Sequence, residues 1–213
     1  MDLLLDFLLP KTCIYCDDFG TYICSSCSTQ LLQEEESEAV EISSGLMVDI
    51  HFGFCYNRAI ELLWEYGKHQ GYFQLCFVAG TILKAKLLDA QANKPPVIDW
   101  ERDIFAPVPI FAGKKAVRGF NQVELMILGM ALTPTPLLTR VKDTKTQVGM
   151  NQNQRKDNLD SAFALNWQAK VLKTRKIWLV DDIYTTGSTM RECLGVLHAS
   201  GYKNIGVLMF AKA

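Results

Sequence analysis

The sequence predicts an α/β protein with a parallel main sheet, preceded by a small cysteine-bearing unit. Two observations lead to this fold class. From about residue 103, apolar strand-like segments alternate with helical ones; strands are expected at 104–108, 177–180 and 205–210, and helices at 119–132 and 188–199. Strand–helix–strand units of this length form right-handed crossovers and a parallel sheet. The second observation is two close cysteine pairs before residue 30. We expect an N-terminal unit at 1–45 and a main domain at 46–213.

The segment between these regions has its own pattern. Residues 47–56 alternate as a strand does, and residues 57–89 have helical periodicity. Gly67 and Gly71 are expected to divide the latter into two helices.

Composition limits the function classes. The net charge of -1 argues against a strongly basic nucleic-acid coat protein. No apolar run approaches the roughly 20 residues that a bilayer requires, so no membrane insertion is expected. Residues 1–10 are apolar but lack a basic start and a cleavage site, which favours an amphipathic helix over a signal peptide. We therefore expect a cytoplasmic protein. The acidic residues at 34–41 are interpreted as a solvated surface.

The paired cysteines predict a structural zinc site. Each C-x-x-C offers two thiolates, and four thiolates complete a closed tetrahedral shell for Zn²⁺. A redox dithiol would need one pair at a helix start after a strand, which is not the pattern here. Cys55, Cys76 and Cys193 are interpreted as inert core thiols. The expected zinc ligands are Cys13, Cys16, Cys24 and Cys27.

The most informative stretch is 177–189. An apolar strand ends in Asp181 and Asp182, a short polar turn follows, and a helix begins. Unpaired N–H groups and the dipole at a helix N-terminus favour an anion such as a phosphate. The carboxylates repel phosphate but can accept hydrogen bonds from ribose hydroxyls. The residues expected to hold the 5′-phosphate are Thr185, Thr186, Gly187, Ser188 and Thr189.

Other phosphate motifs are absent from the sequence, because neither a Walker A loop nor a G-x-G-x-x-G string occurs. An ordinary strand–helix turn capped by Ser188 is the plain alternative. However, residues 180–189 resemble the phosphoribosyl-pyrophosphate signature of type I phosphoribosyltransferases. That resemblance implies a phosphoribosyltransferase-like fold and binding of phosphoribosyl pyrophosphate with Mg²⁺.

Taken together, the motifs resemble the ComF/GntX family, also called competence protein F or ComFC. The likeness covers nearly the whole chain. After the four cysteines come Lys68-His69-Gln70-Gly71, Ala106-Pro107-Val108-Pro109, Arg118-Gly119-Phe120-Asn121-Gln122, Thr144-x-x-Gln147, Arg155, Asn158, Ala162-Phe163 and the phosphoribosyl signature. The chain departs from the family at Tyr72, where an acid is common, and at Gly67 before the lysine turn. The resemblance implies a role in natural transformation, beside incoming single-stranded DNA and a helicase-like competence ATPase.

Basic residues supply candidates for the rest of the site. Lys114, Lys115 and Arg118 could hold pyrophosphate, or could be a solvated helix start. Arg118 and the two acids are the expected catalytic residues, and Lys68 is an expected substrate contact. The polar residues 140–158 favour a mobile loop that closes over the substrate, or a plain surface loop.

Three functions remain open at this stage. The protein could be a phosphoribosyltransferase whose acceptor is recognised by residues before about 100, including Lys68 and the zinc unit. It could be a non-catalytic module that keeps the fold as a ligand sensor and binds single-stranded DNA through its basic residues. In that case Tyr15, Phe19 and Tyr22 either stack on bases or pack around the metal. It could also be an adaptor whose zinc unit docks a helicase.

Overall fold

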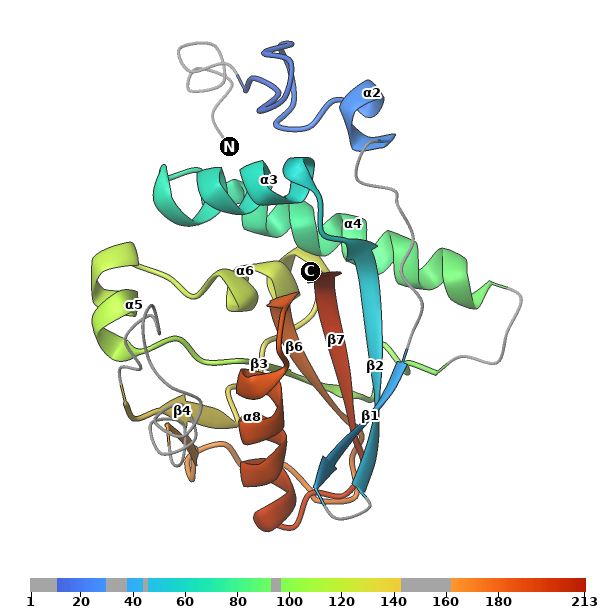
Figure 1. Ribbon diagram of the computed structural model, residues 1–213, viewed down its shortest axis with the longest axis vertical. Coiled ribbons are helices and arrows are strands. Elements are labelled where there is room, and N and C mark those ends of the chain that lie inside the picture. Colours follow the sequence, from blue (N-terminus) through green and yellow to red (C-terminus); the bar gives the residue numbers. More distant parts are fainter. Residues whose placement is uncertain (1–10, 30–37, 44–45, 93–96, 143–161) are drawn as a thin grey trace.

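The structure is a computed structural model that describes residues 11–29, 38–43, 46–92, 97–142 and 162–213 (Figure 1). Three expectations from the sequence lie wholly or partly outside these residues. They are the amphipathic helix at 1–10, the acidic stretch at 34–41 and most of the loop at 140–158, including Thr144, Gln147, Arg155 and Asn158.

A five-stranded sheet in the order β1-β2-β7-β6-β3 forms the centre of the fold. The neighbouring pairs β2–β7, β7–β6 and β6–β3 are parallel, which confirms the predicted parallel sheet. β1 pairs antiparallel with β2. β1 therefore joins the main sheet, although its residues fall within the N-terminal unit predicted at 1–45. The division into two units stays a prediction. The strands are β1 (Glu38–Ser43), β2 (Leu46–Cys55), β3 (Ile104–Pro107), β6 (Ile177–Tyr184) and β7 (Ile205–Lys212).

Helices cover both faces of the sheet (Figure 1). α3 (Arg58–His69), α4 (Gln74–Gln91) and α6 (Gln122–Gly129) pack on one face with Trp178 and Val180 of β6. α8 (Ser188–Ala199) packs on the other face with Ile177 and Leu179, beside the hairpin of β4 (Leu138–Arg140) and β5 (Phe163–Leu165). Successive side chains of β6 therefore enter opposite core layers, as the pleat of a strand requires.

Three predicted boundaries were wrong. β6 continues four residues past Val180, because its pairing with β7 extends to Tyr184 and Lys212. The predicted helix at 119–132 corresponds to the shorter α6 alone; a separate helix, α5 (Ala112–Arg118), precedes it and ends at Gly119, which has a φ of 85°. Gly67 lies inside α3 rather than at its end. α3 ends at His69, and Gly71, with a φ of 82°, lies in the turn to α4.

Local sequence explains the starts of two helices. Asn57 accepts a hydrogen bond from the N–H of Ile60 at 3.0 Å and so caps α3. Asn121 accepts one from the N–H of Val123 at 3.0 Å and caps α6, while its side-chain amide donates to the carbonyl of Val108 at 3.0 Å. Asn121 thereby fixes α6 to the chain that follows β3. Among the described residues, no helix is both long enough and apolar enough to cross a membrane.

Candidate functional site

The turn between β6 and α8 has the form that the sequence predicted for a phosphate loop. Gly187 has a φ of 69° and stands at the cap position of α8, so the cap residue offers no side chain; the N–H of Ser188 donates a long hydrogen bond, 3.5 Å, to Oγ1 of Thr186. Ser188 therefore does not act as the cap that the plain alternative required; its hydroxyl instead lies 3.0 Å from that of Thr186. A cavity of about 40 Å³ opens here, lined by the turn residues and by Asp181. This helix start, the hydroxyls and the cavity suit a small oxyanion.

Asp181 lies on the α8 side of the sheet. It follows Ile177 and Leu179 in the alternation of β6, and it lines the small cavity of the turn. Its Oδ1 accepts a hydrogen bond from the N–H of Asp182 at 2.9 Å. Burial raises the pKa of Asp181 well above its ordinary value, and the neighbouring charge of Asp182 raises it further. An ionised Asp181 would therefore be stabilised by a cation or by hydroxyl donors in the cavity.

Asp182 lies on the opposite face, within a network of polar side chains. Its Oδ2 is 2.5 Å from Nζ of Lys68 and accepts a hydrogen bond from Nε2 of Gln122 at 3.0 Å. Its Oδ1 accepts one from the N–H of Ile183 at 2.7 Å. Burial alone would raise the pKa of Asp182, but the Lys68 ammonium and these hydrogen bonds lower it on balance. Asp182 is thus an ionised carboxylate at neutral pH.

Gln122 joins this network to α5. Its Oε1 accepts a hydrogen bond from Nη1 of Arg118 at 2.5 Å, and its Nε2 donates to Asp182. The structure therefore brings three predicted site residues, Arg118, Asp182 and Lys68, into one hydrogen-bonded chain. Gln122 is not among the site residues that the sequence predicts. Its signal in the sequence was its place in the Arg-Gly-Phe-Asn-Gln string, directly after the cap of α6.

The two lysines of α5 lie outside this chain. Nζ of Lys115 is 3.0 Å from Oε2 of Glu124, and Lys115 lines a cavity of about 290 Å³ beside β3 and β4. Lys114 is exposed on α5. At neutral pH an exposed ion pair such as Lys115–Glu124 exchanges readily with water or an anion.

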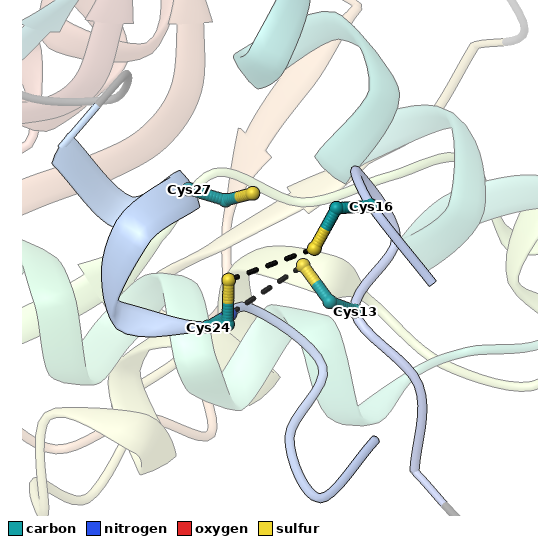
Figure 2. A group of neighbouring side chains, drawn as sticks. All are labelled: Cys13, Cys16, Cys24 and Cys27. Carbon is teal, nitrogen blue, oxygen red and sulfur yellow. Dashed lines mark hydrogen bonds between the residues drawn. The ribbon is translucent and has the colours of Figure 1, made fainter. Parts of the chain in front are cut away.

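The four predicted cysteines meet at one point, drawn in Figure 2. Their Sγ atoms all lie within 4.8 Å of one another, and those of Cys16 and Cys24 are 3.7 Å apart. Zn–S bonds of about 2.3 Å in a tetrahedral shell place the sulfurs roughly 3.8 Å apart, so the group has the size of a zinc shell. Backbone N–H groups, that of Cys24 first, outweigh burial and lower the pKa of Cys13 to about 7. The four cysteines can hold a structural zinc ion.

The four-cysteine unit (described residues 11–29), called the zinc unit below after its expected metal, packs on α3 and on the turn that follows it. The Tyr15 hydroxyl donates to the carbonyl of Ala59 at 2.7 Å, and Ile23 is buried in the same core layer as α3. Tyr22 meets Tyr72 edge to face, with ring centroids 6.4 Å apart. Phe19 is exposed. Tyr15 is therefore a packing residue, while Tyr22 borders the surface.

The fold is an α/β sheet, parallel from β2 to β3, with helices on both faces and an added four-cysteine unit, and the turn at 181–189 lies at the carboxyl end of β6. No protein family model matches the chain. An adenine phosphoribosyltransferase of known structure covers 87% of this chain and 89% of its own, at 12% identity and a TM-score of 0.39. At this TM-score the likeness to that structure carries no argument.

Two competence proteins are similar over most of their length. Competence protein F of Haemophilus influenzae is 26% identical over 211 residues, covering 95% of this chain and 86% of that protein. Competence protein ComFC of Streptococcus pneumoniae is 26% identical over 198 residues, covering 91% and 84%. These similarities support the placement of the chain in the ComF family.

Proposed function

We propose that this protein is a ComF-type accessory of DNA uptake whose main domain binds phosphoribosyl pyrophosphate with Mg²⁺. The observation that carries the proposal is the start of α8 at Gly187, whose cap residue has no side chain, beside the carboxylate of Asp181 in the second half of the parallel strand β6. Ligands of parallel α/β sheets bind at this edge. The two similar competence proteins supply the biological setting.

In this proposal each part of the ligand has a contact in the turn or on α5. N–H groups of α8 and the hydroxyls of Thr185, Thr186, Ser188 and Thr189 would hold the 5′-phosphate. Asp181 would accept hydrogen bonds from ribose hydroxyls, with Asp182 held in place by Lys68 and Gln122. Arg118, with Lys114 and Lys115 on the same helix, would face the pyrophosphate.

The carboxylates also suit a magnesium ion. Mg²⁺ prefers oxygen ligands and is usually bound through one or two carboxylates together with substrate phosphates. The raised pKa of Asp181 indicates a buried carboxylate that a nearby cation would stabilise. When bound, Mg²⁺ would neutralise part of the charge on the leaving pyrophosphate. In this proposal the protein acts on or alongside single-stranded DNA entering the cytoplasm.

A second candidate is a non-catalytic sensor or adaptor. One observation favours it: Lys68, Asp182, Gln122 and Arg118 already satisfy one another without a ligand. A protein of this kind would use the ligand to set its conformation and would present its zinc unit to a helicase-like competence ATPase or bind single-stranded DNA. Ligand binding without turnover would separate this candidate from the enzyme.

Calorimetric titration of phosphoribosyl pyrophosphate with Mg²⁺ into zinc-loaded protein tests the proposal. We expect saturable binding that is lost in the Asp181→Asn/Asp182→Asn variant. The matched control is Asp89→Asn/Glu101→Gln, which removes two negative charges from exposed positions and should bind as the parent does. Absence of binding at millimolar ligand would refute the proposal and leave the adaptor as the better candidate.

The single variant Asp181→Asn should change ligand affinity and protein stability in opposite directions. The pKa of Asp181 is raised in the folded protein, so at neutral pH its ionised form opposes folding, and this cost disappears as the pH falls through the raised pKa. Asn is uncharged, so the variant should be more stable at pH 7, by on the order of 1 kcal/mol, yet bind the ligand more weakly. Urea unfolding at pH 7 and calorimetry measure the two effects. Equal or lower stability would contradict the burial argument.

A further inference from the structure

A third cavity lies between the four-cysteine unit and the turn from α3 to α4. Its volume is about 420 Å³, which is within the range of small-molecule pockets. Lys11 and Tyr22 line it from the zinc unit, and Gln70, Tyr72 and Gln74 line it from the turn and the start of α4. The site described above uses none of these five side chains.

The lining combines aromatic rings with amide groups. The ring of Tyr72 is held edge to face by Tyr22 and by Tyr66, with centroids 6.4 Å and 5.7 Å away. Tyr72 is nevertheless 41% exposed, so part of its ring is open to a ligand. Within the described part of the chain, the side-chain amides of Gln70 and Gln74 make no hydrogen bond. Fixed aromatic rings beside open amides are the groups with which proteins stack and read a nucleobase.

The turn also connects this cavity to the phosphoribosyl site. Lys68 precedes Gln70 by two residues, and its ammonium contacts Asp182 at the other site. The N–H groups of Gln70 and Tyr72 both donate to the carbonyl of Tyr66 at 3.3 Å, which fixes the turn against the end of α3. The last turn of α3 therefore presents Lys68 to Asp182 of β6, and the residues that follow directly present Gln70 and Tyr72 to the cavity.

We propose that this cavity binds a single nucleobase, either free or at the end of a single-stranded nucleic acid. The base would stack on Tyr72, and its polar edge would meet the amides of Gln70 and Gln74. This inference rests on the proposed function only in explaining why a base should bind beside a phosphoribosyl site. Base binding itself can be measured without phosphoribosyl pyrophosphate.

Fluorescence titration with 2-aminopurine tests the proposal, because the emission of this base is quenched when it stacks. The probes are free 2-aminopurine, a short oligothymidylate with 2-aminopurine at its 3′ end, and a dye-labelled oligothymidylate of equal length that is abasic at that position. We expect saturable quenching of one or both 2-aminopurine probes. Quenching of the free base identifies a small-molecule source, and quenching of the oligonucleotide alone identifies a strand end.

Variants locate the binding. Tyr72→Ala should weaken binding about 5-fold or more, since base stacking on an aromatic ring contributes roughly 1–3 kcal/mol. Tyr56→Ala removes another partly exposed tyrosine, outside the cavity, and should have no effect. Gln70→Ala/Gln74→Ala should also weaken binding while zinc content and phosphoribosyl-pyrophosphate affinity stay unchanged. This second variant keeps the test valid if Tyr72→Ala does not fold.

Three results would overturn the inference: no quenching of either probe at millimolar protein, equal affinity for the abasic oligonucleotide, or parental affinity in both the tyrosine and the glutamine variants. The parallel titration with phosphoribosyl pyrophosphate separates the two proposals. If the base binds but phosphoribosyl pyrophosphate does not, base binding in the cavity is supported and the proposed function is wrong. If phosphoribosyl pyrophosphate binds but the base does not, only the proposal for the cavity is wrong.

Discussion

At the scale of single residues, the two adjacent aspartates have different environments because they lie on opposite faces of β6. Asp181 faces the small cavity of the turn and has a raised pKa. Asp182 is paired with Lys68 and Gln122 and has a lowered pKa. One carboxylate thus remains available for a ligand, while the other organises the side chains around it.

We predict that Lys68→Met lowers the free energy of unfolding by about 3 kcal/mol at pH 7, because it leaves the charge of Asp182 without its partner in a mostly buried position. Adding Asp182→Asn should recover part of the loss. The pKa of Asp182 is lowered, so its contribution is present above its ordinary value of 3.8 and is lost as the pH falls below it. The difference in the free energy of unfolding between the parent and Lys68→Met should therefore become smaller toward pH 3.

Urea unfolding of the two single variants and the double variant, across pH, measures this coupling. Lys115→Met is the matched control, since the Lys115–Glu124 pair is much more exposed, at 48% and 30% of the side chains. Loss of this ion pair should lower the free energy of unfolding by less than about 1 kcal/mol. If Lys68→Met and Lys115→Met lowered the free energy of unfolding equally, the buried network would contribute no more stability than an exposed ion pair.

At the scale of the element, the turn from β6 to α8 depends on a glycine. Gly187 adopts a left-handed conformation, and a Cβ there would lie 2.7 Å from Cζ of Tyr184. The turn reverses the chain within three residues, from the end of β6 at Tyr184 to the start of α8 at Ser188. This tightness brings the N–H groups of α8 next to Asp181.

Gly187→Ala should therefore lower the free energy of unfolding by roughly 1–2 kcal/mol and weaken phosphoribosyl-pyrophosphate binding. Gly195→Ala, in the same helix, is the control: its Cβ would meet no atom within 4 Å. That variant should be more stable by about 0.5–1 kcal/mol, because alanine favours helix. Thermal unfolding measures the change in stability, and calorimetric titration measures the affinity for phosphoribosyl pyrophosphate. A Gly187→Ala protein as stable as the parent would mean that the turn tolerates another conformation.

At the scale of the whole molecule, the zinc unit is part of the main core rather than a free appendage. Cys13, Ile23 and Cys27 are buried in the same layer as α3 and α4, and Tyr15 bonds to the start of α3. Loss of a bound metal should therefore disturb the packing of α3 and, through Lys68, the proposed phosphoribosyl site.

We predict one zinc ion per chain and a fall in melting temperature of roughly 5 °C or more when a chelator removes it. Cys16→Ser should bind zinc more weakly and melt at a lower temperature. Cys55→Ser changes a cysteine outside the cluster and should keep its zinc. Elemental analysis measures the zinc content, and thermal unfolding measures the melting temperature. A parent protein that folds equally well with no bound metal would argue against a structural zinc site.

The sequence by itself determined the features that depend on near neighbours in the chain. The apolar runs predicted the parallel sheet, the start of α8 was placed at Ser188, and the C-x-x-C spacing identified four cysteines that do meet. These patterns are short-range, because the periodicity of a strand, the start of a helix and a metal knuckle are each set within a few residues. The strand ends and the division of α5 from α6 were harder to predict, since they depend on pairing with β7 and on the conformation of Gly119.

Only the tertiary structure decided how the site is shared among elements. Gln122 reaches Asp182 across 60 residues of chain, and Tyr15 reaches Ala59 across 44. Such contacts depend on how α3 and α6 pack over the sheet, which no local pattern specifies. The placement of Asp181 and Asp182 on opposite faces follows from the same cause: β6 continues past Val180 only because β7 is there to pair with it.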